Sequence, residues 1–249
     1  MRPRIAIPMP HSTDLEYGER AIPQYERAVV IAGGEPVRVE LNQKPAEIRL
    51  LARSCAGVLL PGSNADVDPA KFGQVRSDHT AAADPLREQA DFLLLEDAYT
   101  QRKPVFCICY GLQSLNVFRG GSLVQHIPDF LPEQTRGKVN HEAGRKVAVA
   151  HSAAIAQESL LAQVVGAGDA GVGQHGNLVP VNSSHHQSAD TIGDGLRVVG
   201  RCPEDGIIEA LEGTSQDHFV LAVQWHPERS VADDEPSVAI FRALVNASR

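Results

Sequence analysis

The chain has 249 residues, of which 43% are hydrophobic and 22% charged, and its formal net charge at pH 7 is -8. This acidic balance argues against a nucleic-acid partner and gives no reason to expect an anionic membrane as partner. No apolar run approaches the roughly 18 residues of a membrane-spanning helix, and the first nine residues lack a secretory signal, so we expect a cytoplasmic protein. Four cysteines without a CxxC pair fit neither a disulfide scaffold nor a zinc ribbon.

Strand-like and helix-like segments alternate through the first half of the chain. Short apolar runs predict strands, and apolar residues at helical spacing predict helices. Asp84 followed by Pro85 is typical of a helix start, with aspartate as N-cap and proline at the first helical position. The predicted strands cover residues 4–8, 36–41, 56–60 and 104–108, and the predicted helices cover 19–32, 46–53, 85–102 and 110–118.

The second half of the chain has a different pattern, with short strands separated by turns. We predict strands at 146–150, 178–181, 196–201, 207–211 and 219–224, and a closing helix at 234–247. The whole pattern indicates an α/β fold with an open, mostly parallel sheet flanked by helices and a smaller antiparallel portion in the second half. We treat residues 1–249 as a single domain.

A GxGxxG match at residues 166–171 is not interpreted as a dinucleotide site. Such a site needs a strand before the glycines and a helix after them. Here helix-like residues precede the match and a glycine-rich run follows it. A mobile surface loop is the better interpretation.

The strongest chemical signal is the segment PVFCICYGLQ at residues 104–113. A buried strand runs directly into a helix and Cys109 lies on the turn, at the sheet edge where open α/β folds place their sites. The helix N-terminus favours the thiolate, and the N–H of Tyr110 is free to face a developing oxyanion. Gln113, four residues on, projects from the same helix face as Cys109. A lone cysteine would be interpreted as a small core residue, but this setting predicts a nucleophile.

A second signal is FVLAVQWHPE at residues 219–228, an apolar strand that ends in His226, Pro227 and Glu228. Residues two apart on an extended chain face the same side. Glu228 is therefore placed to orient His226, and His226 to serve Cys109 as base. The alternative is a solvated strand end with no function.

Two further segments are polar loops after strands. In GVLLPGSNADVDP, residues 57–69, the N–H of Gly62 is a candidate second oxyanion donor, although the segment alone is an ordinary strand and turn. In VNSSHHQ, residues 181–187, two adjacent histidines suggest a metal. Neighbouring side chains diverge in extended structure and no suitably spaced third ligand is nearby in the sequence. A polar substrate-binding turn formed by Asn182, Ser183 and His185 is favoured over a metal site.

These segments, together with DPLREQAD and the longer run ICYGLQSLNVFRGGSLVQ, resemble the class I glutamine amidotransferase superfamily in order and content. More narrowly they resemble the γ-glutamyl-γ-aminobutyrate hydrolase branch of the γ-glutamyl hydrolase-like cysteine peptidases. The resemblance covers nearly the whole chain and implies a flavodoxin-like sheet. It also implies a Cys109–His226–Glu228 triad, oxyanion donors at Gly62 and Tyr110, and substrate contact at Gln113.

The sequence departs from the family pattern on both sides of the nucleophile. Cys107 stands where the family often has glycine or alanine, and we interpret it as a buried strand residue. A disulfide to Cys109 would be strained and would silence the enzyme. Tyr110 stands where some members carry arginine, which leaves the leaving group open.

The resemblance implies hydrolysis of γ-glutamyl amides through a cysteine thioester, with a small-molecule substrate, no metal and no organic cofactor, in a pathway such as polyamine catabolism. Two alternatives stay open: a glutaminase subunit that passes ammonia to a synthase, and a non-catalytic protein that binds γ-glutamyl ligands. The leaving amine and the oligomeric state, with a homodimer as one option, are not determined.

Overall fold

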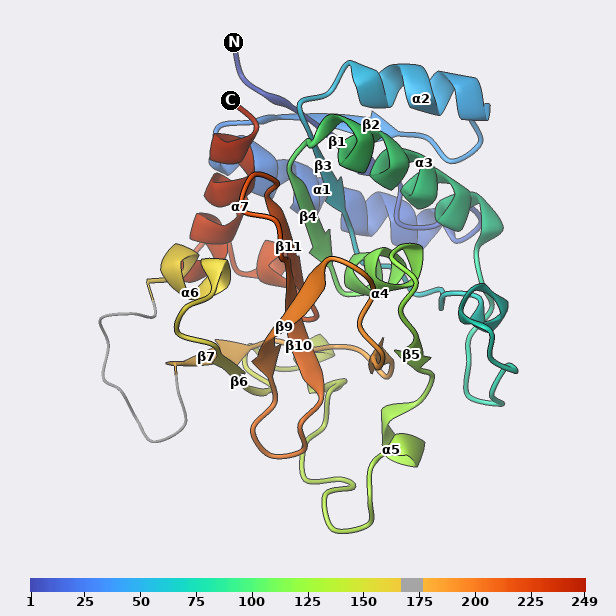
Figure 1. The fold of residues 1–249 in the computed structure, drawn as a ribbon, viewed down its shortest axis with the longest axis vertical. Coiled ribbons are helices and arrows are strands. Elements are labelled where there is room, and N and C mark those ends of the chain that lie inside the picture. Colours follow the sequence, from blue (N-terminus) through green and yellow to red (C-terminus); the bar gives the residue numbers. More distant parts are fainter. Residues whose placement is uncertain (167–176) are drawn as a thin grey trace.

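The computed structural model describes residues 1–166 and 177–249, which form one large sheet covered by helices on both faces (Figure 1). The strand order is β2-β1-β3-β4-β11-β10-β9-β6-β7. The first five strands in this order run parallel and the last four pair antiparallel. Their bounds are β1 Arg4–Pro8, β2 Glu35–Val39, β3 Gly57–Leu60, β4 Val105–Ile108, β6 His151–Ile155, β7 Asn177–Val181, β9 Leu196–Arg201, β10 Ile208–Gly213 and β11 Val220–Val223. The predicted fold class is confirmed.

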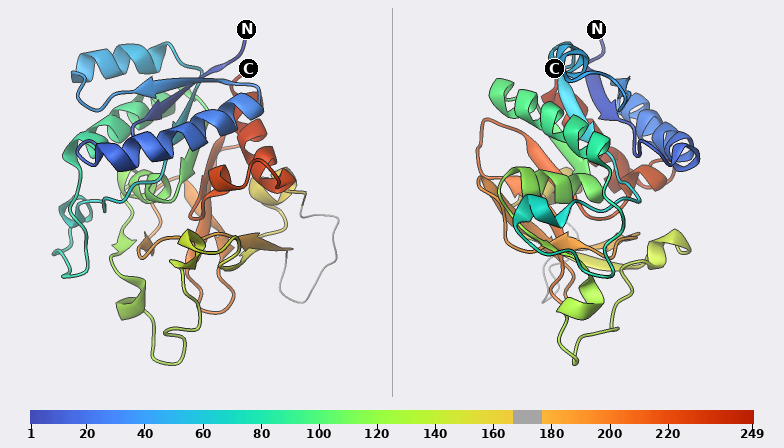
Figure 2. Two further views of the ribbon diagram at one scale, coloured as in Figure 1. Left: turned by 180° about the vertical axis from the view of Figure 1, so that it is seen from behind. Right: turned by 90° about the vertical axis from the view of Figure 1, so that its right-hand side faces the viewer.

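The helices form two layers, which the right-hand view of Figure 2 shows on either side of the parallel strands. One layer contains α1 Leu15–Ile31 and α7 Glu235–Ala247, with the short α6 Leu160–Val164 beside α7. The other contains α2 Pro45–Arg53, α3 Pro85–Gln101 and α4 Tyr110–Phe118. A small second sheet joins β5 Leu123–Val124 to β8 Ser188–Ala189 next to the short helix α5 Ile127–Phe130. None of the described helices combines the length and the apolar character needed to cross a bilayer.

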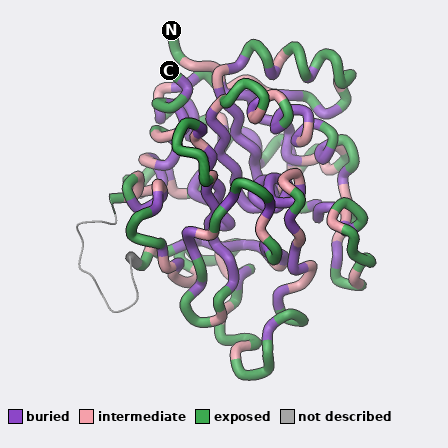
Figure 3. The backbone as a smooth tube through the Cα atoms, in the orientation of Figure 1, coloured by how far each residue is buried: buried purple, intermediate pink, exposed green. Residues whose placement is uncertain are grey.

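The core lies along the central parallel strands, which Figure 3 shows as continuous buried backbone. Every residue of β3, β4 and β11 is buried. Strands covered by helices on both faces need apolar side chains on both, which explains the uninterrupted runs GVLL, VFCI and VLAV. This packing fixes the carboxyl ends of the three strands side by side.

Several predicted elements match the structure closely. The strand at 4–8, the helix at 110–118 and the strand at 196–201 have the predicted bounds. The Asp84 carboxylate accepts the N–H of Arg87 and Pro85 is the first residue of α3, as expected for a helix start. Local chemistry therefore decided these boundaries.

Other predictions were wrong or incomplete. The strand predicted at 146–150 is absent: its two valines are half exposed, and the strand in this region is β6 five residues later. Helix α1 begins at Leu15 rather than at 19, because the Asp14 carboxylate caps it. The short elements β5, α5, α6 and β8 were missed. The GxGxxG match falls largely on residues 167–171, outside the described part of the chain.

Candidate active site

Cys109 occupies a strained turn between β4 and α4. Its φ of 53° and ψ of -107° place it in a region that residues other than glycine rarely adopt, and among the described residues only Arg102 shares a positive φ without being glycine. The Cys109 N–H donates to the Val223 carbonyl at 2.8 Å, which anchors the turn to β11. At Gly111 a side chain would collide with Leu60, since a Cβ there would lie 2.4 Å from its carbonyl oxygen. Strain held in place by its surroundings is characteristic of a nucleophile elbow.

His226 and Glu228 lie together where β11 ends. The two atoms His226 Nδ1 and Glu228 Oε1 are 2.7 Å apart, so the ring N–H donates to the carboxylate and Nε2 is left for other partners. Burial alone would lower the pKa of His226, but the charges of Glu228 and Cys109 outweigh it and raise that pKa to about 9. An imidazole that keeps its proton at neutral pH suits a thiolate–imidazolium pair.

The main chain of His226 is held from both sides by one side chain, Asn182. The Asn182 amide donates to the His226 carbonyl at 2.9 Å, and its oxygen accepts the His226 N–H at 2.8 Å. Asn182 is buried at the end of β7, so this double hydrogen bond joins the antiparallel part of the sheet to the triad candidate. Asn182 thus holds the main chain of His226 in place.

The two predicted oxyanion donors lie on either side of Cys109. As the first residue of α4, Tyr110 has a backbone N–H with no acceptor inside the helix. A Cβ at Gly62 would lie 3.0 Å from His226 Cε1, 3.1 Å from the Tyr25 hydroxyl oxygen and 3.7 Å from Cys109 Cβ, so a side chain there would crowd the first two groups. The Gly62 N–H donates to the Tyr25 hydroxyl at 3.1 Å, and an oxyanion must therefore share or replace that acceptor.

A buried ion pair that sequence reasoning missed supports the Gly62 loop. Arg87 Nε lies 2.7 Å from Asp91 Oδ1, and both side chains are fully buried. The guanidinium also donates to the carbonyls of Pro61 at 2.5 Å and Pro10 at 2.9 Å, and it stacks over the Tyr110 ring. Burial opposes the charge, but Asp91 keeps the pKa of Arg87 above its ordinary value. The sequence signal that could have revealed this pair is an arginine four residues before an aspartate on a predicted helix.

A cavity of about 520 Å³ opens beside His226 and Glu228. Its walls come from α1, the loop after β3, residues 144–145 and Ser184. Each of three lining arginines has a guanidinium nitrogen within 4.0 Å of a glutamate carboxylate, that of Glu16, Glu142 or Glu228. These arginines, Arg20, Arg145 and Arg229, still outnumber the one lining carboxylate, Glu228. The cavity is therefore suited to a small substrate that carries negative charge.

The side chains predicted to contact substrate are engaged with the protein instead. Gln113 donates to the Gln187 carbonyl and to the Gln224 side chain, both at 3.3 Å. Ser183 donates to Glu209 at 3.1 Å, and Asn182 holds His226. From the VNSSHHQ turn it is Ser184 that lines the cavity. Direct substrate contact by these residues stays a prediction.

His185 points away from the cavity into a group of metal-ligand side chains. Its partners are His141, His151 and Glu209, and the four ligand atoms all lie within 4.8 Å of one another. The sequence has no suitably spaced third ligand near the adjacent histidines, but the fold brings three candidate ligands to His185 from 24 or more positions away. No periodic motif connects them.

Cys107 is a fully buried residue of β4, as predicted, with a free thiol. Burial raises its pKa well above the ordinary value, which disfavours the thiolate. Cys109 is also a free thiol. Of the two cysteines, only Cys109 lies on the turn beside His226.

Comparison with known proteins gives a family match and named relatives. The family model described as Peptidase C26 matches residues 6–228. A Mycobacterium tuberculosis protein named provisionally as a glutamine amidotransferase is 37% identical over 90% of this chain, which spans 66% of that protein's length. A γ-glutamyl-γ-aminobutyrate hydrolase of Escherichia coli O157:H7 is 31% identical over 90% of this chain and 84% of its own length.

Solved structures with the same fold include a glutaminase domain and a protein named as a synthase subunit. The glutaminase domain of Trypanosoma brucei CTPS, solved with bound acivicin, aligns with a TM-score of 0.60 at 18% identity, covering 98% of this chain and 94% of that one. A Thermoplasma acidophilum protein named provisionally as part of a GMP synthase aligns with a TM-score of 0.62 at 14% identity, covering 100% and 94%. These similarities establish a class I glutamine amidotransferase-like fold.

Proposed function

The chain belongs to the peptidase C26 family and is a glutamine amidotransferase-like hydrolase, and we propose that it cleaves γ-glutamyl amides with Cys109 as nucleophile. One observation carries the proposal: Cys109 lies on a strained elbow next to His226, whose other side is bonded to Glu228 at 2.7 Å. A nucleophile, a base and a group that orients the base are the minimum for covalent acyl transfer.

The proposed reaction has two halves. The Cys109 thiolate attacks the γ-carbonyl carbon, and the carbonyl π electrons move onto the oxygen. The imidazolium of His226 then gives its proton to the amide nitrogen as the C–N bond breaks, which leaves a γ-glutamyl thioester and a free amine. In the second half His226 takes a proton from water, the hydroxide attacks the thioester, and glutamate leaves as the thiolate re-forms. Side chains supply every proton transfer, so this chemistry requires no cofactor.

Oxyanion stabilisation is assigned to the backbone N–H groups of Tyr110 and Gly62. Removing one such donor typically costs about 3 kcal/mol of transition-state stabilisation. The Gly62 N–H reaches the oxyanion by exchanging its hydrogen bond with Tyr25 for a charge-assisted one, which is stronger than the neutral bond it replaces. Arg87 donates to the carbonyls of Pro61 at 2.5 Å and Gly62 at 3.4 Å, which supports the loop that carries the Gly62 N–H.

The arginines around the cavity favour a substrate with carboxylates at both ends. A γ-glutamyl group contributes one α-carboxylate, and an amino acid as leaving group contributes a second. Guanidinium groups pair with carboxylates in bidentate geometry. We therefore place γ-glutamyl-γ-aminobutyrate and similar γ-glutamyl amino acids ahead of amides with cationic or small leaving groups. The substrate would bind as a free small molecule, and no partner protein is required.

A panel of γ-glutamyl amides tests this order of substrates. Glutamate release would be measured with γ-aminobutyrate, a neutral alkylamine, a diamine and ammonia as leaving groups. We expect kcat/KM to be highest for γ-aminobutyrate and to fall at least about tenfold for the diamine, since the diamine places a cation near the arginines. Turnover of glutamine alone would instead favour the glutaminase alternative. Binding without any turnover would overturn the hydrolase proposal.

A further inference from the structure

The interior of the antiparallel half contains a group of titratable side chains that the proposed reaction does not use. Three histidines surround one carboxylate oxygen: His141 Nδ1, His151 Nε2 and His185 Nε2 lie 3.1, 3.2 and 3.4 Å from Glu209 Oε1. The side chains of all four are at most 4% exposed. They come from the loop after α5, from β6, from the turn after β7 and from β10. We call this group the His141 cluster.

The outer nitrogen of each ring is already used. His185 Nδ1 lies 2.8 Å from the Gln187 carbonyl and His151 Nδ1 lies 3.1 Å from the Ser152 carbonyl. A carbonyl only accepts hydrogen bonds, so both Nδ1 atoms carry the proton. In a neutral imidazole the inner Nε2 is then an unprotonated lone pair. His141 also has its outer nitrogen engaged, with Nε2 2.9 Å from an Asp205 carboxylate oxygen, but its inner Nδ1 has a hydrogen-bond partner in Glu209 Oε1 at 3.1 Å.

The inner nitrogens of His151 and His185 are consequently left facing an oxygen that cannot donate to them. Among the described residues neither His151 Nε2 nor His185 Nε2 has a hydrogen-bond partner. Both nitrogens are close enough to Glu209 Oε1 for a hydrogen bond. The rings are oriented so that the angle at the nitrogen is unfavourable, and no hydrogen bond forms. Buried polar atoms without protein partners are rare and typically mark the position of a bound water or ion.

The carboxylates of Glu209 and Asp205 carry two negative charges, which two protonated imidazoles would balance. The third ring would then keep an unprotonated inner nitrogen facing a carboxylate oxygen, which cannot donate a hydrogen bond to it. One divalent cation among three neutral imidazoles cancels the same two charges and gives each inner nitrogen a partner.

We propose that the His141 cluster is a structural site for a divalent transition-metal ion of the zinc type, bound by His141 Nδ1, His151 Nε2, His185 Nε2 and Glu209 Oε1. Zinc binds imidazole nitrogen and carboxylate oxygen at about 2.0–2.1 Å, so tetrahedral ligands lie roughly 3.3 Å apart. The three nitrogen-to-Glu209 distances of 3.1, 3.2 and 3.4 Å match that spacing. Calcium and magnesium prefer all-oxygen sites and fit this donor set poorly.

The surroundings have the outer hydrogen bonds expected of a metal site. Ligating histidines usually donate their second N–H to a carboxylate or a backbone carbonyl, as all three do here. The second Glu209 oxygen accepts from the Ser183 hydroxyl at 3.1 Å, which fixes the carboxylate. Four protein ligands in a buried site leave no open position for substrate, which is typical of a structural site rather than a catalytic one.

Such an ion would hold one wall of the active-site cavity. The Gly144 N–H donates to the Ser183 carbonyl at 2.8 Å and the His185 N–H to the His141 carbonyl at 3.0 Å, so the 141–145 segment packs on the 182–185 turn. Gly144, Arg145 and Ser184 line the cavity. The Gln224 N–H also donates to the Glu209 carbonyl at 2.8 Å, two residues before His226.

Metal content measured by mass spectrometry tests the site without reference to activity. The purified chain would be stripped with a chelator, incubated with excess zinc, and passed through gel filtration. We expect about one equivalent of zinc per wild-type chain and a melting temperature higher than that of the stripped protein. His185→Gln should retain at least about tenfold less zinc, since one of four ligands is lost.

His79→Gln is the matched control. His79 belongs to a second trio of ligand types, with His126 and Asp129, but that trio is largely exposed. We expect this variant to bind zinc like the wild type. If His185→Gln does not fold, the visible spectrum of the wild type loaded with cobalt(II) tests the site instead. A tetrahedral cobalt(II) site produces intense visible absorption bands. A wild type with less than about one-tenth of an equivalent after zinc loading, or with no such cobalt bands, would overturn the proposal.

Discussion

The Tyr25 hydroxyl accepts the hydrogen bond of the Gly62 backbone N–H at 3.1 Å, and both groups lie against the predicted triad. Tyr25 is buried on α1 and lines the cavity, and Gly62 follows β3, so this bond joins the two elements beside the cavity. In the free protein it satisfies an N–H that would otherwise be buried without an acceptor. In the proposed reaction the Gly62 N–H must donate to the oxyanion instead.

Tyr25→Phe should therefore affect stability more than rate. The variant leaves the Gly62 N–H unpaired in the free enzyme, and we expect a loss of about 1–3 kcal/mol in the free energy of unfolding, measured with urea. The kcat should fall less than about tenfold, because the N–H regains a partner in the oxyanion. A fall of about a hundredfold or more would instead mean that the hydroxyl itself stabilises the oxyanion.

Arg87→Ala is expected to destabilise the protein strongly. It leaves the Asp91 carboxyl group fully buried without its partner and removes the donor for the Pro61 and Pro10 carbonyls. Breaking a buried pair in this way typically costs about 3–5 kcal/mol. Urea denaturation would measure the change.

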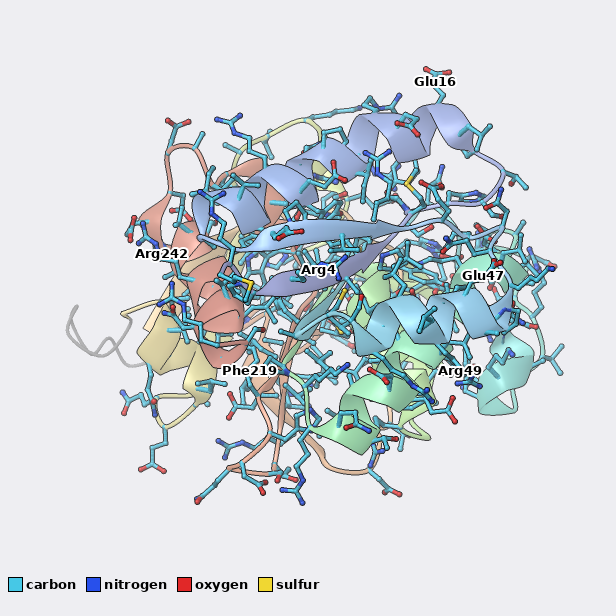
Figure 4. The ribbon with its side chains drawn as sticks, turned by 90° about the horizontal axis from the view of Figure 1, so that it is seen from above. Arg4, Glu16, Glu47, Arg49, Phe219 and Arg242 are labelled. Carbon is cyan, nitrogen blue, oxygen red and sulfur yellow. The ribbon has the colours of Figure 1, made fainter. Side chains whose placement is uncertain are left out.

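Arg49→Ala is the matched control for this loss. Arg49 lies on α2 at the periphery of the molecule, paired with Glu96 in solvent (Figure 4). A surface ion pair is worth at most about 1 kcal/mol, so this variant should unfold close to the wild type. Equal losses in the two variants would show that the buried pair has no special role.

Asn182→Ala should impair the positioning of His226. The substitution leaves the His226 N–H and carbonyl without their partner in a buried setting. We expect kcat to fall at least about tenfold with a smaller change in KM, because the alanine removes support from the base and not from the substrate. Asn246→Ala, an exposed asparagine on α7, is the control and should leave both constants unchanged. A rise in KM at constant kcat would point to a binding role.

The pH dependence follows from the pKa of His226, which is raised to about 9. His226 must be protonated to give a proton to the leaving amine, so the alkaline limb of kcat/KM should lie near pH 9. Glu228→Gln removes the main charge that raises this pKa, and the limb should move to lower pH. A limb at the same pH in both proteins would contradict the assigned pair.

The free energy of unfolding should also depend on the protonation of His226. A histidine whose pKa is higher in the folded state than its ordinary value of about 6.5 stabilises the fold fully below that value. The contribution is lost as pH rises through about 9. The free energy of unfolding of the wild type should therefore decrease between these two pH values, and Glu228→Gln should show a smaller decrease in urea titrations at each pH.

The parts of the site that could be predicted from sequence are those formed by contiguous residues. Cys109 between a buried strand and a helix, and His226 two residues before Glu228 at a strand end, are local patterns that the structure places together. The support by Asn182 joins residues 44 positions apart, and the His141 cluster joins residues up to 68 positions apart, which meet only through the antiparallel half of the fold. Contacts of this kind leave no periodic pattern in the sequence. The strand at 151–155, which carries one member of the cluster, was itself predicted five residues too early.

Glutamate release from γ-glutamyl-γ-aminobutyrate by the wild type, Cys109→Ala and Cys107→Ala would decide whether Cys109 is the nucleophile. Both cysteines are buried and lie two residues apart, but only Cys109 is on the elbow beside His226. We predict that Cys109→Ala loses at least about a thousandfold in kcat, since it lacks the nucleophile, while Cys107→Ala stays within about tenfold of the wild type. Turnover by Cys109→Ala at the wild-type rate would contradict the assignment of Cys109 as nucleophile.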